Sequence, residues 1–135
     1  MGETRTEISP AAVTGIHHHD GTVVVEVTGQ VDMACSAPIR AIVGEQLDRR
    51  PTGLVVDLTG VDFFGSAGVQ LLVEAVVQAR ALGVALAVAT DRRAVLHPLR
   101  LTRVDEALDV HPTPRDALAA LRTGGVPTAP RVACR

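Results

Sequence analysis

The 135-residue sequence has no lysine, tryptophan, tyrosine or asparagine, and its only aromatic residues are Phe63 and Phe64. Without further rings there is little on which a base or a sugar could stack, which argues against single-stranded nucleic acid and carbohydrate as ligands. Arginine and lysine together number 13, all of them arginine, against 15 acidic residues, and the net charge is −2. The chain therefore lacks the positive field that holds nucleic acid or an anionic membrane.

Cysteine is also scarce. Cys35 and Cys134 lie far apart and form no Cys-x-x-Cys pair, so the sequence has neither a disulfide framework nor a zinc motif, although a single disulfide stays compatible with it. The N-terminus has no apolar core of the kind a signal peptide requires. Apolar runs such as Val84–Ala89 are far shorter than the roughly 20 residues that span a bilayer. We expect a cytoplasmic protein with no membrane segment.

Hydrophobic periodicity predicts strands and helices in alternation. Strands are expected over Ile8–Ile16, Thr22–Thr28, Gly53–Asp57, Val84–Ala89 and Leu108–His111. Helices are expected from Ser36 to a stop at Arg49-Arg50-Pro51, over Ser66–Leu82, over Ala94–Leu99 and from Pro114 to about Leu121. This order indicates an α/β fold with a mixed sheet of four to five strands and about four helices. The domain should occupy residues 8–122, between a flexible start at 1–7 and a disordered Pro- and Arg-rich tail at 123–135.

Local signals refine the pattern. Asp20-Gly21 predicts a hairpin turn and Gly83 a helix end. Leu58–Gly65 is expected to be a connection, Asp91 to cap the third helix, and Pro98 to distort or shorten that helix. In the second helix we expect one side to face the core, formed by Val69, Leu72, Val73 and Val76. We expect the opposite side to be polar, formed by Gln70, Glu74 and Gln78.

Catalytic and metal-binding motifs fail on inspection. In His17–His19, only the first and third side chains could share an ion, because neighbours on a strand face opposite ways, and a solvated turn is the simpler interpretation. A nucleophile elbow needs glycine two residues before the serine, but Phe64 precedes Ser66 in that place. A P-loop needs lysine. His97 and His111 stand beside prolines and are expected to be surface residues. We therefore expect no enzyme, no cofactor and no metal.

Asp57–Val69 is the most informative segment, because a buried strand runs through small residues into an amphipathic helix. Ser66 falls at or next to the N-cap. Free backbone N–H groups and the helix dipole favour negative charge there, so a phosphate on Ser66 would be well tolerated. The simpler alternative is an N-capping serine worth about 1 kcal/mol.

Four segments resemble motifs of one family in order and spacing. Gly29–Asp32 resembles its G-E-[LIV]-D, and Leu54–Val61 its central strand and turn. Phe63–Val69 resembles its F-[IL]-D-S-[ST]-G-[LV] phosphorylation loop. Leu101–Asp105 followed by Leu108–Val110 resembles L-T-G-[LV]-D and the last strand. Over most of its length the chain is thus similar to the STAS domain of bacterial anti-sigma factor antagonists.

The resemblance implies partner switching. In that family the antagonist binds an anti-sigma factor, a serine kinase with the histidine-kinase-like ATPase fold, and so frees a sigma factor. Phosphorylation of the loop ends the contact and a serine phosphatase restores it. From charge and hydropathy, we expect neither nucleic acid nor a membrane among the partners. Carried over residue by residue, the partner surface comprises Asp32, Asp62, Phe64, Gly65, Ser66, Ala67 and Gly68.

The loop departs from the family pattern where it matters. The family has Asp-Ser-[Ser/Thr]-Gly with the second hydroxyl as acceptor, and this chain has Gly65-Ser66-Ala67-Gly68. Ala67 cannot be phosphorylated, and Gly65 removes a carboxylate and adds backbone freedom. Three outcomes are open: Ser66 is the acceptor, the kinase binds without switching the protein off, or control is exerted elsewhere, for example through Cys35 or Cys134.

Neighbouring residues carry alternatives too. Asp32 fits both a partner contact and a turn that closes on backbone N–H groups. Of Phe63 and Phe64, one should enter the core and the other join an apolar surface, because neighbours in extended chain face opposite ways. Two other functions are possible alternatives to an anti-sigma factor antagonist. One is an accessory STAS module in a stress-sensing or lipid-transport assembly. The other is a regulator that binds a small ligand or nucleotide, although the absence of lysine and of a phosphate-binding loop argues against a nucleotide.

Overall fold

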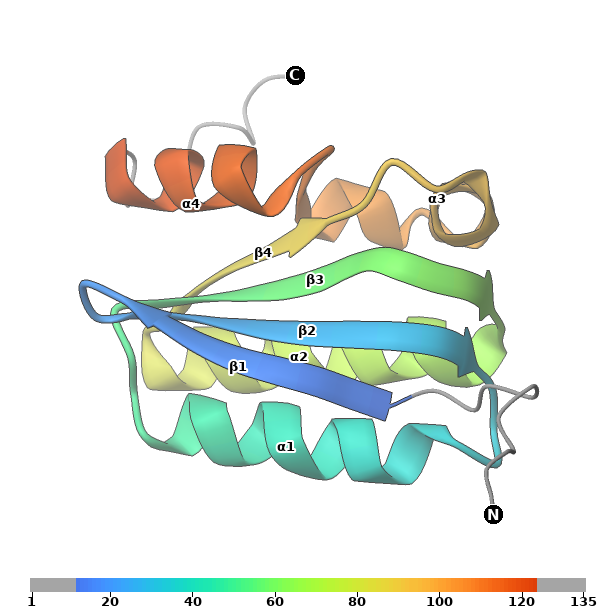
Figure 1. Cartoon of the computed structure of the whole chain (residues 1–135), viewed down its shortest axis with the longest axis horizontal. Helices are drawn as coiled ribbons and strands as arrows, with labels where there is room; N and C mark the ends of the chain where they lie inside the picture. Colours follow the sequence, from blue (N-terminus) through green and yellow to red (C-terminus); the bar gives the residue numbers. More distant parts are fainter. Residues whose placement is uncertain (1–11, 124–135) are drawn as a thin grey trace, which may run out of the picture.

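The computed structural model describes residues 12–123 (Figure 1). The elements in chain order are β1 (Ala12–His19), β2 (Thr22–Val31), α1 (Ser36–Asp48), β3 (Gly53–Phe64), α2 (Ser66–Leu82), β4 (Ala85–Ala89), α3 (Arg93–Leu101), a 3₁₀ turn (Val104–Ala107), β5 (Asp109–His111) and α4 (Pro114–Thr123). The strands form one sheet in the order β1-β2-β3-β4-β5. Among the strands of residues 12–123, only β1 and β2 pair antiparallel, so the predicted mixed α/β architecture is confirmed.

The described residues include only part of the predicted chain ends. The flexible start at 1–7 and residues 124–135 of the predicted tail lie outside the described residues. Thr123, expected in the tail, is the last residue of α4. No helix within residues 12–123 combines the length and the hydrophobicity that crossing a membrane needs.

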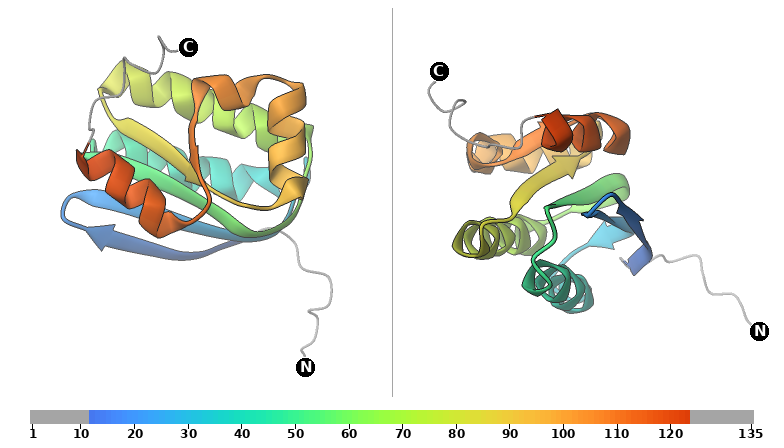
Figure 2. Two further views of the ribbon diagram at one scale, coloured as in Figure 1. Left: turned by 90° about the horizontal axis from the view of Figure 1, so that it is seen from above. Right: turned by 90° about the vertical axis from the view of Figure 1, so that its left-hand side faces the viewer.

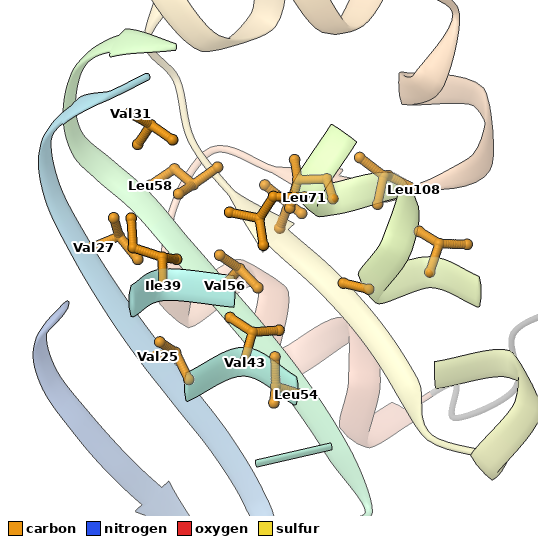
Figure 3. Packing of buried hydrophobic residues seen from close by; sticks show 14 of the residues in the cluster. Val25, Val27, Val31, Ile39, Val43, Leu54, Val56, Leu58, Leu71 and Leu108 are labelled. Carbon is orange, nitrogen blue, oxygen red and sulfur yellow. The ribbon is translucent and has the colours of Figure 1, made fainter. Parts of the chain in front are cut away.

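Helices cover both faces of the sheet (Figures 1 and 2). Val23 and Val25 of β2 point into the larger core, which α1 and α2 cover, whereas Val24 between them joins a smaller cluster beneath α4. Figure 3 shows the larger core, where strand valines interlock with Ile39 and Val43 of α1. Burial on both faces explains why the parallel strands read as nearly continuous apolar runs.

The β1–β2 hairpin forms as the sequence indicates. Asp20 and Gly21 both have positive φ, 50° and 87°, as a two-residue type I′ turn requires. The histidines differ from expectation, since His17–His19 end β1 and are not turn residues. They are exposed, and His17 lies 3.5 Å from Glu26. No three potential metal-ligating side chains cluster anywhere in residues 12–123.

The strand β3 runs to Phe64, so the predicted connection over Leu58–Gly65 is wrong for most of its length. Glu26 pairs with Asp57 and Thr28 with Gly60, so β3 takes one residue more than β2 over this interval. Such a bulge bends the strand without ending it. The buried carboxylate of Asp57 supports the bend, because its Oδ1 accepts hydrogen bonds from the backbone N–H of Thr59 at 3.0 Å and from its hydroxyl at 2.7 Å.

A second irregularity follows four residues later. Gly29 pairs with Val61, but Gln30 pairs with Phe63, so Asp62 is the extra residue of β3. Gly29 has a φ of 96°, which glycine adopts without strain. The strand β2 therefore passes through Gly29 and continues to Val31, three residues beyond its predicted end at Thr28. After the two bulges, β2 and β3 remain paired up to their last residues, Val31 and Phe64.

Several residues in α2, α3 and β5 differ from the sequence predictions. Val73 does not face the core but is exposed. Glu74 and Gln78 are not on the far side but both bond to α1. Arg92 and not Asp91 occupies the N-cap of α3. Pro98 does not shorten that helix, which runs from Arg93 to Leu101 with the proline inside it. His111 is half-buried, 3.0 Å from Asp109, and is not a surface residue.

Replacing Asp57 with alanine should lower the free energy of unfolding by about 1–3 kcal/mol, because two donors of Thr59 lose their acceptor inside the bulge. The matched control is Asp62→Ala, which removes an exposed carboxylate from the same strand and should cost no more than about 1 kcal/mol. Urea denaturation of both variants measures the difference. Equal losses would show that the Asp57 carboxylate does not support the bend.

Candidate functional site

The candidate partner-binding site lies at the C-terminal ends of β2 and β3. Because the two strands are parallel, the segments that follow them leave from the same edge of the sheet. Val31 pairs with Phe64, and the backbone carbonyl of Val31 accepts a hydrogen bond from the N–H of Gly65 at 2.9 Å. This contact holds the turn before α2 beside the β2–α1 turn, and so brings Asp32 and Ser66 to one edge.

Asp32 closes the turn that leads into α1. Its Oδ1 accepts a hydrogen bond from the N–H of Cys35 at 3.0 Å, and its carbonyl lies 3.1 Å from the same nitrogen. The expected turn role is therefore confirmed, while a partner contact stays a prediction. Cys35 is the half-buried N-cap residue of α1 and packs against the core. Cys134 lies outside the described residues.

The two phenylalanines face opposite ways, as expected. Phe64 is 3% exposed and therefore has no surface with which to touch a partner, which corrects its place among the expected contact residues. Phe63 is 51% exposed and is the aromatic side chain at the surface. Its ring lies 3.1 Å from the position that a Cβ on Gly65 would take. Of the two rings, only that of Phe63 is accessible at the surface.

Gly65 is the N-cap residue of α2, with φ −90° and ψ −170°. Any residue adopts this extended conformation, so the backbone freedom expected of Gly65 is not used. The absent side chain at Gly65 instead affects the surface, because it lets the Phe63 ring lie close to the Gly65 backbone. Ser66 comes next as the first helical residue and is exposed, so its hydroxyl does not cap the helix but faces solvent.

Gly68 permits close packing at the start of α2. A Cβ at this position would lie 2.7 Å from Cε1 of Phe64, well inside van der Waals contact. Phe64 is itself held in the core, so the ring has no free space to move into. Gly68 is therefore a structural residue that seats the helix on Phe64, and being buried it does not itself form surface.

Asp62 forms an exposed ion pair that the sequence did not reveal. Its Oδ1 lies 3.3 Å from Nη1 of Arg92, whose Nε donates to the carbonyl of Thr59 at 3.0 Å. Arg92 comes from the start of α3, 30 residues further along the chain. This clamp joins α3 to β3 beside the candidate loop. Ala67, the remaining loop residue, is half-buried.

The STAS domain model matches residues 15–117, and the chain belongs to this family. It is 30% identical over 122 residues to the anti-sigma-F factor antagonist RsfB of Mycobacterium tuberculosis, covering 87% of this chain and 97% of RsfB. It is 31% identical over 121 residues to RsfA of the same organism, covering 88% and 94%. A crystal structure of an anti-sigma factor antagonist from Mycobacterium paratuberculosis superposes with a TM-score of 0.76 at 32% identity, covering 88% and 99%.

Gly68→Ala should lower the free energy of unfolding by about 1–3 kcal/mol, because the new methyl group overpacks against the Phe64 ring. Gly44→Ala, also inside a helix, is the matched control. A Cβ there would meet only Oε1 of Gln78 at an ordinary 3.5 Å, so this change should stabilise the protein by about 0.5–1 kcal/mol. Denaturant titration compares the two, and a neutral or stabilising effect at Gly68 would contradict the packing argument.

Proposed function

We propose that the chain is a cytoplasmic anti-sigma factor antagonist, which binds an anti-sigma factor and thereby releases a sigma factor, and that it catalyses no reaction itself. One observation carries this proposal. RsfB and RsfA bear the name anti-sigma-F factor antagonist, and their alignments with this chain cover 97% and 94% of their lengths. The likeness therefore extends over the whole domain, including the loop before α2.

The contact surface in this proposal lies around the turn between β3 and α2. Phe63, Asp62 and Ser66 are exposed there, and Asp32 stands at the same edge. Binding through exposed side chains on a preformed turn needs little rearrangement of the backbone, which suits a contact that must form and break repeatedly.

The partner we propose is a serine kinase with the histidine-kinase-like ATPase fold. It would transfer the γ-phosphoryl group of ATP to Oγ of Ser66, with loss of the hydroxyl proton and release of ADP, and a serine phosphatase would hydrolyse the ester. Ser66 is the one hydroxyl residue between Gly65 and Gly68. With Ala67 at the position of the family's acceptor, the modification moves one residue towards the N-terminus.

The start of α2 suits a phosphate. The first turn contains no acidic residue, and the positive end of the helix dipole lies at Ser66. A phosphoryl group brings a charge of about −1.5 to −2 to an exposed contact residue. The modified helix would stay folded, and the partner would have to desolvate that charge to remain bound.

Incubation with ATP and the candidate anti-sigma kinases of the same genome tests the proposal. We expect a complex without ATP, a mass increase of one phosphoryl group with ATP, and an affinity at least about tenfold weaker after modification. Ser66→Ala should bind and stay unmodified. Binding with no mass increase would refute phosphorylation alone, and no binding to any candidate would favour an accessory STAS module.

A further inference from the structure

The outer side of α3 carries basic side chains and no acidic one. Val95 and Leu99 are fully buried and turn the inner side of this helix into the larger core. Because each residue turns an α-helix by about 100°, Arg93, His97 and Arg100 lie together on the side opposite these two. All three are exposed. The helix therefore presents two guanidinium groups and an imidazole to solvent on one side.

Neither of these two arginines is neutralised by an ion pair within residues 12–123. Asp91 precedes the helix and Glu106 follows it in the 3₁₀ turn, and both are exposed without pairing to Arg93 or Arg100. Asp105 in the same turn is half-buried. Arg93 also lies in the first turn of α3, where the positive end of the helix dipole disfavours a cation. These charges therefore do not stabilise the helix that carries them.

Leu101 adds an apolar group to this side of α3. It lies four residues after His97 and next to Arg100, and it is 71% exposed. Arg103, also exposed and without an ion pair in the described part of the chain, follows two residues later. Arginine beside an exposed leucine is a composition typical of protein–protein interfaces. Nucleic acid fits less well, because this side has no aromatic ring for stacking and the net charge of the chain is −2.

The helix α3 is held in place close to the ends of β2 and β3. Nε of Arg92 donates to the carbonyl of Thr59 at 3.0 Å, and its Nη1 lies 3.3 Å from Oδ1 of Asp62. At the other end of the helix, the hydroxyl of Thr102 donates to the carbonyl of Pro98 at 2.8 Å. Figures 1 and 2 show α3 beside the end of β3 and the start of α2. A protein bound at the strand ends would therefore come close to α3 without any change of fold.

We propose that the basic side of α3, formed by Arg93, His97, Arg100 and Leu101, is a second contact surface for the anti-sigma partner and receives an acidic surface of that protein. The inference rests on the proposed function, in which the partner binds at the turn between β3 and α2. Charge complementarity carries it, because arginines without an ion pair attract carboxylates and bind them through two parallel hydrogen bonds. Attraction of this kind mainly raises the rate of association. The basic side of α3 thus guides the partner towards the loop.

The double variant Arg93→Gln/Arg100→Gln tests the basic side of α3, and Arg50→Gln/Arg115→Gln is its matched control. Arg50 and Arg115 are also exposed and form no ion pair in residues 12–123, so both variants lose two positive charges. Association with the labelled anti-sigma partner is measured by stopped-flow mixing at about 50 and about 300 mM salt, with thermal melting as the check on folding. At low salt we expect the first variant to associate at least about fivefold more slowly and to depend less on salt. The control should stay within about twofold of the unmodified chain.

The outcomes separate the two claims. If the unmodified chain binds no candidate partner, the proposed function fails and this inference fails with it. If the unmodified chain binds and both double variants associate as fast as it does, only the basic side of α3 is refuted. Equal slowing of both variants would show an effect of net charge alone and would also refute it. If Arg93→Gln/Arg100→Gln associates normally with the partner but loses binding to anionic phospholipid vesicles or to duplex DNA, the surface serves another ligand and the proposal is overturned.

Discussion

The packing of Phe64 against Gly68 is the constraint on which the candidate site depends. Phe64 ends β3 with its ring in the core, and the absent side chain at Gly68 lets the first turn of α2 approach that ring. The hydrogen bond from Gly65 to the carbonyl of Val31 then fixes the turn beside β2. With these two contacts at its base, Ser66 is exposed on a firmly held turn of helix.

The order of the elements and the start of α2 at Ser66 were predictable, because apolar periodicity and glycine positions report directly on local structure. The path of β3 was not. Its two bulges change which side each later residue faces, so no pattern of alternation could decide which phenylalanine is buried. Val73 was misplaced for a similar reason, because α2 has more apolar residues than one face can bury, and the position of α1 decides which stay exposed.

The loop shows how a family fold can keep a function while its residues change. Gly65 lies where the family motif has aspartate, and the Phe63 ring fills that space, so an apolar surface replaces a charged one. Ala67 removes the usual hydroxyl, yet Ser66 keeps a hydroxyl one residue earlier, at a helix end that favours a phosphate. A phosphate on Ser66 would therefore be the one charged side chain between Phe63 and Val69.

Amide hydrogen exchange of the full chain, alone and bound to its anti-sigma partner, tests the central claim most directly. The account predicts that binding slows exchange in the turn after β3 and in the first turn of α2, while amides of the edge strand β1 keep their rates. Protection confined to α1 or β1, with α2 unchanged, would contradict it.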